Sequence, residues 1–259
     1  MNINPRKTFL IVVDGVLAIY IVLAMTVLNT SRVLGATGNG LRAPETCPAL
    51  DVTLTQNTAE GFLDKADIES MLKTDKLYPV GKKIDSIDIR SIEERLLKSP
   101  FISDAQCFKG IDGRVSLRIA QRTPVVRVKA ENGDDYYVDS EGELLPNTKY
   151  TPNILVATGN ISERYARKVL SRVGCLIAED DFWQNEAVQL HILPGGTIEL
   201  VPRVGDHIVF LGTPNNIREK LDRLEKFYKY GLSQIGWNKY SYVNVAFSNQ
   251  IICKKKKKK

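Results

Sequence analysis

The sequence predicts an α+β protein with an N-terminal transmembrane helix. A small domain in the order β-α-α-β-β follows it, and then a mostly antiparallel β domain with flanking helices. Three observations support this prediction: one apolar run long enough to cross a bilayer, helical periodicity between short strands after it, and alternating strands through the second half. A chain of 259 residues has room for an anchor and two modest domains.

The apolar run from Phe9 to Leu28 is the predicted membrane anchor. About 20 helical residues, rising about 1.5 Å each, cross a hydrocarbon core of about 30 Å. Arg6 and Lys7 precede the run, which favours a cytoplasmic stub at residues 1–8. A cleaved signal peptide is the alternative, although its apolar region is normally about 7–15 residues long. Asp14 interrupts the run and is either a contact for another membrane helix or a tolerated interfacial charge.

Charge and cysteine spacing exclude two classes of ligand. The formal charge of +6 is supplied by Lys254–Lys259, and the rest of the chain carries 30 basic and 30 acidic residues. Because nucleic-acid binding needs positive charge on a folded face, no nucleic-acid partner is expected, and residues 254–259 are interpreted as a solvated tail. The cysteines are too scattered for a zinc site, and they form either two disulfides or four small buried side chains. They are Cys47, Cys107, Cys175 and Cys253.

Residues 29–50 are rich in Gly, Asn, Thr and Pro and are predicted to be a linker, followed by a first domain at 51–122. Asp88 is the predicted N-cap of a helix that ends before Pro100, and Ile87 can pack on Ile92 as a hydrophobic staple. The other expected elements of this domain are a strand at 52–56, a helix at 64–73, and strands at 101–108 and 113–121.

The second domain is predicted at 123–253 and contains mainly short strands. Ser162 caps one predicted helix. Thr213 caps another that has Pro214 at its first position and ends at Gly231. The expected strands are 125–128, 136–138, 154–157, 188–193, 197–201 and 207–211, with one long final strand from Tyr240 to Cys253.

The sequence offers no catalytic constellation. His191 and His207 lie in separate predicted strands, where a histidine is usually a surface or core residue. Phosphate-binding and nucleophile-elbow motifs do not occur. The acidic pair Asp134/Asp135 and the run 179–181 lie in predicted loops, and an envelope enzyme that uses them is the weakest hypothesis. We therefore expect neither enzymatic activity nor a cofactor, a metal or a small-molecule substrate.

Three segments together resemble the FtsQ/DivIB family of bitopic bacterial division proteins, which carry a POTRA domain followed by a β domain. They are IDIRSIEERLLKSPFISDAQCFKGIDGRVSLRIAQRTPVVRV (residues 87–128), YYVDSEGELLP (136–146) and YVNVAFSNQIICK (242–254). With the N-terminal anchor, the resemblance covers essentially the whole chain. The final segment resembles versions from the Bacteroidetes-like branch.

The resemblance implies a non-catalytic scaffold at the division septum, anchored in the bacterial inner membrane with its C-terminal domains in the periplasm. Such a protein links early and late division proteins and binds FtsB/FtsL-like bitopic partners. In the family the partner adds a strand at the end of the β domain. The implied partner-binding residues are Tyr240, Tyr242, Asn244, Ala246, Phe247, Asn249 and Ile251.

Two questions stay open at this point. Alternation places Phe247 on the same face as Val243 and Val245, which is typical of core, although the family has an aromatic contact there. Ala246 stands where many relatives carry a basic residue, so no salt bridge is implied at that position. The alternative function is a POTRA-containing envelope transport or secretion component, which needs a channel-forming segment after Leu28.

Overall fold

The computed structural model describes residues 44–55, 62–148 and 152–256. The predicted anchor at 9–28, with Asp14, lies outside these residues. Within the described ranges, no helix combines the length and the apolar character that crossing a membrane requires. The anchor and its orientation therefore stay predictions.

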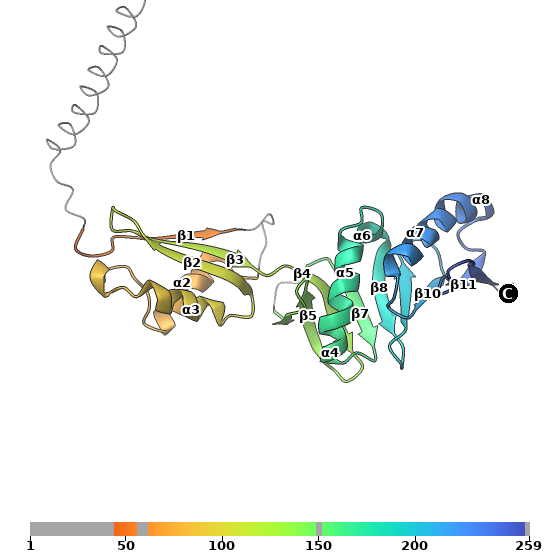
Figure 1. The fold of residues 1–259 in the computed structure, drawn as a ribbon, viewed down its shortest axis with the longest axis horizontal. Helices are drawn as coiled ribbons and strands as arrows, with labels where there is room; N and C mark the ends of the chain where they lie inside the picture. The colour runs from red at the N-terminus through yellow and green to blue at the C-terminus, as the bar shows by residue number, and fades with distance from the viewer. Residues whose placement is uncertain (1–43, 56–61, 149–151, 257–259) are drawn as a thin grey trace, which may run out of the picture.

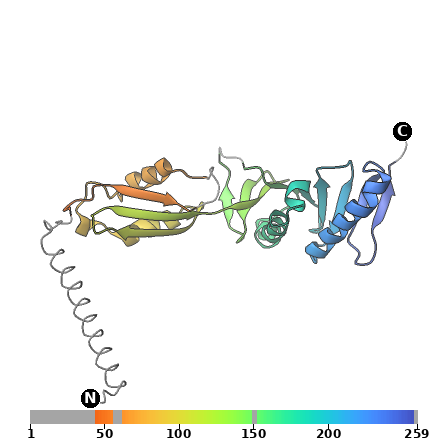
Figure 2. The same ribbon diagram turned by 90° about the horizontal axis from the view of Figure 1, so that it is seen from above.

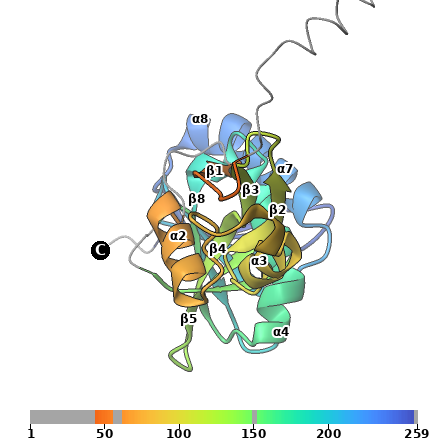
Figure 3. The same ribbon diagram turned by 90° about the vertical axis from the view of Figure 1, so that its left-hand side faces the viewer.

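The first folded unit is a three-stranded sheet with two helices on one face (Figure 1). The strand order is β1 (Leu50–Leu54), β3 (Val115–Gln121), β2 (Ile102–Lys109), with β3 parallel to β1 and antiparallel to β2. Helices α2 (Lys65–Thr74) and α3 (Ile89–Leu97) share one side of the sheet, as the view along the long axis in Figure 3 also shows. The predicted β-α-α-β-β order is confirmed.

Polar caps and one apolar pair explain where the two helices begin. Asp64 and Asp67 form a capping box at α2, with Asp67 N donating to Asp64 Oδ1 at 2.8 Å and Asp64 N to Asp67 Oδ2 at 2.9 Å. Asp88 accepts two backbone N–H bonds at the start of α3, as the sequence predicts. Ile87 and Ile92 are both buried in the same core, consistent with the predicted staple.

Packing in this unit begins before its first strand. Cys47 is buried, and its N–H donates to Lys82 O at 2.9 Å, just before a short 3₁₀ helix, η1 (Ile84–Ser86). Residues 44–49, which the sequence assigns to the linker, are therefore part of the folded unit. All four cysteines are free thiols, buried at Cys47 and Cys107 and half-buried at Cys175 and Cys253.

The second unit is built on one nine-stranded sheet with the order β12-β11-β10-β9-β8-β7-β4-β5-β6. The pairs β4–β7, β7–β8 and β10–β11 are parallel and the other pairs are antiparallel, so the sheet is mixed. The strands are β4 (Pro124–Ala130), β5 (Asp135–Asp139), β6 (Leu144–Pro146), β7 (Leu155–Gly159), β8 (Ala187–Ile192), β9 (Ile198–Pro202), β10 (Ile208–Gly212), β11 (Tyr240–Asn244) and β12 (Ile252–Lys255).

Helices cover one face of this sheet and leave the other open. Along β10, Val209 and Leu211 are fully buried, whereas Ile208 and Phe210 on the opposite face are not. The helical segments are α4 (Glu163–Tyr165), the π-helix η2 (Ala166–Leu170), α5 (Ser171–Ala178), α6 (Trp183–Glu186), α7 (Ile217–Phe227), the π-helix η3 (Tyr228–Leu232) and α8 (Ser233–Ile235).

The prediction of one long final strand from Tyr240 to Cys253 is wrong. The segment is a hairpin, in which β11 and β12 pair antiparallel around a loop at 245–251. The loop contains Ser248 and Asn249, which are typical turn residues. The alternating residue pattern runs on into this loop, although the backbone there is no longer a strand.

The predicted ends of the last long helix are also wrong. Thr213 does not cap it, because the helix begins at Ile217 after Asn216, whose φ of 53° is left-handed. Gly231 does not end it, because a short π-helix carries the helical segment on to Ile235.

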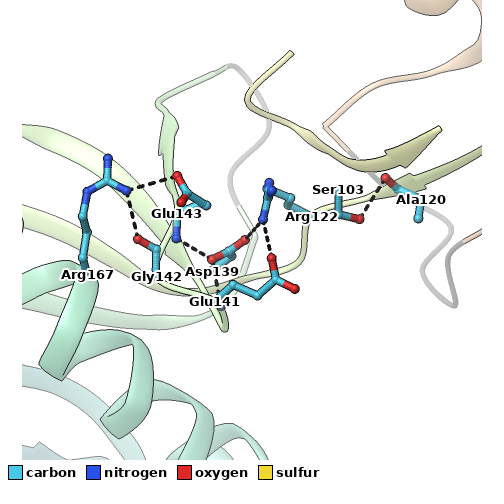
Figure 4. Close-up of polar contacts among 8 residues, drawn as sticks. All are labelled: Ser103, Ala120, Arg122, Asp139, Glu141, Gly142, Glu143 and Arg167. Atoms are coloured by element: carbon cyan, nitrogen blue, oxygen red, sulfur yellow. Dashed lines mark hydrogen bonds and ion pairs between the residues drawn. The ribbon is translucent and has the colours of Figure 1, made fainter. Parts of the chain in front are cut away.

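Arg122 lies at the joint between the two units, which follow one another along the long axis (Figures 1 and 2). Its N–H donates to Phe101 O at 2.8 Å, and its Nη1 bonds to Asp139 Oδ2 at 2.8 Å (Figure 4). The Phe62 ring stacks on Phe101, with centroids 5.1 Å apart, and meets Tyr137 of β5 edge-on at 5.5 Å. An ion pair and an aromatic cluster therefore connect the units.

Candidate functional site

The β11–β12 end of the large sheet is the candidate binding site. β12 is last in the strand order, and no described strand pairs with its outer side. Lys256 N donates to Lys239 O at 3.1 Å, so the backbone of Lys256 faces β11. Because N–H and C=O groups alternate sides along an antiparallel strand, those of Cys253 and Lys255 face outward. An extended segment could pair with them.

The open face beside this edge is apolar and aromatic. The register sets Ile208 opposite Tyr242 and Asn244 opposite Ile252, so all four lie on the side away from the helices. The Tyr242 ring stacks on Phe210, with centroids 6.2 Å apart. Ile208 and Ile252 are 40% and 48% exposed, which is high for aliphatic side chains within a sheet. The strip is therefore suited to contact another apolar surface.

Tyr242 is held in place by a hydrogen bond across the sheet. Its hydroxyl donates to Glu199 Oε1 at 3.2 Å. Burial and the neighbouring Glu199 charge raise the pKa of Tyr242 to about 12, so the hydroxyl stays protonated and keeps donating. This bond fixes the ring on the open face.

The structure divides the predicted contact residues among three environments. Val243 and Val245 are buried as predicted, whereas Phe247 is 47% exposed in the loop, so it is not a core residue. A register shift between Tyr240 and Tyr242 turns Tyr240 toward the core, which breaks the predicted alternation. Tyr242 and Asn244 lie on the open face, Ala246, Phe247 and Asn249 in the loop, and Tyr240 and Ile251 against the core.

Contacts from β10 and β11 hold the start of the 245–251 loop. Val245 N donates to Phe210 O at 3.0 Å, and Ala246 N donates to Asn244 Oδ1 at 2.9 Å. Ala246 also packs on Gly212, where a Cβ would lie only 2.9 Å from the Ala246 Cβ. A side chain at position 212 would therefore displace the loop.

Sequence reasoning missed Ile208, Phe210 and Ile252 as members of this surface. The first two lie in a strand that was correctly predicted, and their alternation with Val209 already signals the face opposite the core. Ile252 carried no such signal, because its strand was merged with β11 in the prediction. Only the hairpin brings Ile252 beside Asn244.

The two histidines have ordinary structural partners. His191 Nδ1 lies 3.1 Å from Thr158 Oγ1, and buried His207 Nε2 lies 2.7 Å from Tyr228 Oη. Burial lowers the pKa of His207, which favours the neutral ring. In the ranges that the structure describes, no group of three His, Cys, Asp or Glu side chains is placed to hold a metal.

The fold defines a two-domain protein in which a small α/β unit precedes a mixed-sheet domain with an open terminal edge. Residues 45–120 match the POTRA-like domain family, and residues 123–254 match the family described as FtsQ/DivIB, C-terminal related. The second match covers more than half of the chain, and the chain belongs to this FtsQ/DivIB-related family.

Two curated relatives agree with this assignment. The chain is 29% identical over 187 residues to the cell division protein FtsQ of Geotalea daltonii, and 23% identical over 187 residues to FtsQ of a Geobacter species. Each alignment covers 68% of this chain and 66% of the relative, so the chain spans just under two thirds of their length. The chain is therefore FtsQ-like in both of its folded units.

Proposed function

We propose that this protein is a bitopic division scaffold that links early and late division proteins at the septum. In this proposal residues 1–8 are cytoplasmic, residues 9–28 span the inner membrane, and both folded units are periplasmic. An FtsB/FtsL-like partner docks on the β11–β12 hairpin by adding a strand to β12. Membership of the FtsQ/DivIB-related family supports the division role.

The single observation that carries the docking proposal is the free outer edge of β12 beside an apolar face. Outward N–H and C=O groups at Cys253 and Lys255 provide main-chain bonding for an extended segment. Ile252, Tyr242 and Ile208 lie on the adjoining face, where they contact alternate side chains of that segment. Main-chain bonds give affinity, and these side chains give specificity.

The other edge of the sheet suits docking less well. β6 has only three residues, Leu144–Pro146, and proline has no N–H to donate. Lysines on β12 are compatible with either role, since charge also discourages unwanted edge pairing. The exposed apolar side chains beside β12 favour a specific partner, because protection from aggregation alone needs no such face.

Photo-crosslinking in dividing cells tests the docking site. A photoreactive residue at Ile252 or Phe247 should crosslink to the FtsB-like protein of the same organism. Tyr230 is the matched control, because it is 77% exposed but lies on the helical side of the domain. Crosslinks from Tyr230 equal to those from Ile252 would show that the β12 edge is not the docking site.

Substitutions separate lost contact from lost folding. Phe247→Asp should weaken partner binding and leave the melting temperature nearly unchanged, because the side chain is half exposed. Val245→Asp buries a carboxylate in the core and should unfold the domain. Equal affinity of Phe247→Asp and wild type for the partner would remove Phe247 from the site.

A further inference from the structure

Arg223 reaches from α7 to the loop that joins β11 and β12. Its Nη2 donates to Val245 O at 2.8 Å, and its Nη1 donates to Ser248 O at 2.9 Å. The two carbonyls belong to the first and the fourth residues of the loop. A planar guanidinium holds its N–H donors in a rigid fork and can bond two separated acceptors at once. The ammonium group of lysine is a compact charge on a flexible chain and does not fix two acceptors in this way. Arg223 therefore clamps the loop to the helix.

The clamp acts beyond the contacts that hold the first two residues of the loop. Phe210 O and Asn244 Oδ1 hold the first two loop residues, Val245 and Ala246. The bond from Arg223 to Ser248 extends this support beyond the exposed Phe247 side chain. Release of Arg223 would free the loop around Phe247, while the core contacts of Val245 remain.

The arrangement places two cations close together on one helix. Lys220 is only 6% exposed, and its Nζ donates to Thr213 O at 2.7 Å. Burial and the Arg223 charge lower the pKa of Lys220. The Nε of Arg223 is itself buried without a partner among the described residues. Neither the lowered pKa of Lys220 nor the unpartnered Nε of Arg223 stabilises the fold. We therefore assign the guanidinium a role in shaping the loop and not in general stabilisation.

We propose that Arg223 is a positioning residue of the docking site, which holds the 245–251 loop so that Phe247 and the β12 edge are presented together. This inference rests on the proposed docking at β12. Arg223 itself does not contact the partner in this scheme. Its effect passes through the Val245 and Ser248 carbonyls.

The test compares Arg223→Met and Arg223→Lys with Arg218→Met in the full chain. Arg218 is the matched control, because it is exposed on the same helix and its loss removes the same charge. Hydrogen exchange in detergent micelles reports loop order without a partner, and crosslinking from Ile252 in cells reports docking. Arg223→Met should speed exchange at 246–250 by about ten-fold and reduce the crosslink by a similar factor. Arg223→Lys should rescue only part of either effect.

Three outcomes overturn the inference. The first is unchanged exchange and crosslinking in Arg223→Met. The second is faster exchange in core strand β9 equal to that in the loop, which would make Arg223 a general stabilising residue. The third is a loosened loop with full crosslinking. All three leave docking at β12 intact, provided that wild type crosslinks from Ile252. No crosslink from wild type would overturn both this inference and the proposed function.

Discussion

Asp139→Ala should destabilise the protein by about 3–5 kcal/mol, because it breaks a buried ion pair and leaves its partners unsatisfied. The Asp139 side chain is 4% exposed, and its Oδ2 lies 2.8 Å from Arg122 Nη1. Its Oδ1 accepts the backbone N–H groups of Glu141 at 2.9 Å and Glu143 at 2.7 Å. Alanine leaves the two backbone donors without their acceptor, and it leaves the guanidinium, which is 18% exposed, with only the exposed Glu141 carboxylate.

Glu141→Ala is the matched control for this effect. Glu141 Oε2 lies at the same distance, 2.8 Å, from the same Arg122 nitrogen, but its side chain is 70% exposed (Figure 4). Exposed ion pairs contribute about 0–1 kcal/mol, so Glu141→Ala should change stability little. Burial, and not distance, makes the difference between the two carboxylates.

Calorimetric unfolding of the two variants, and of each combined with Arg122→Met, measures these energies. The coupling between Asp139 and Arg122 should exceed that between Glu141 and Arg122 by at least about 1 kcal/mol. Because Arg122 joins the two units, Asp139→Ala should also separate their unfolding transitions. Equal losses for Asp139→Ala and Glu141→Ala would refute the argument from burial.

Two further predictions concern buried titratable groups. Since burial lowers the pKa of His207, its neutral ring stabilises the fold above about pH 6.5, and this contribution is lost as pH falls through the lower folded value. His207→Gln should therefore flatten the fall in melting temperature on acidification, and parallel curves would contradict this. Burial and the Glu93 charge raise the pKa of Cys107 to about 11, so iodoacetamide should modify it only after unfolding, whereas half-buried Cys253 reacts sooner. Equal rates for the two thiols in the folded protein would reject that prediction.

The first unit could be predicted because its signals are local. Asp88 caps a helix that Pro100 cannot continue, and the alternation of Val115, Leu117 and Ile119 marks a half-buried strand. Each of these patterns needs only a few neighbouring residues. The joint between the units could not be predicted, because Phe62, Phe101 and Tyr137 meet only in the folded chain.

The terminal hairpin shows where periodicity fails. From Tyr242 to Val245 the alternation is correct, yet composition alone did not reveal that the strand stops there and returns at Ile252. The prediction of where α7 begins failed for a similar reason. Thr213 and Pro214 have the composition of a helix start. However, the carbonyl of Thr213 accepts a hydrogen bond from the buried Lys220 ammonium, and the chain turns through left-handed Asn216 before the helix begins.

The position of β12 constrains what kind of partner can reach it. β6 and β12 are the two edges of a nine-stranded sheet, and strands about 4.8 Å apart separate these edges by about 38 Å. The first unit and the β11 end of the sheet lie at opposite ends of the molecule (Figures 1 and 2). With the proposed anchor before Pro44 and the long axis directed away from the membrane, a partner from the same membrane has to pass the first unit and then cross the sheet. A helix rising about 1.5 Å per residue needs about 25 residues for the sheet alone. A bitopic partner with a long helical spacer before its docking segment meets this requirement, and a short membrane peptide does not.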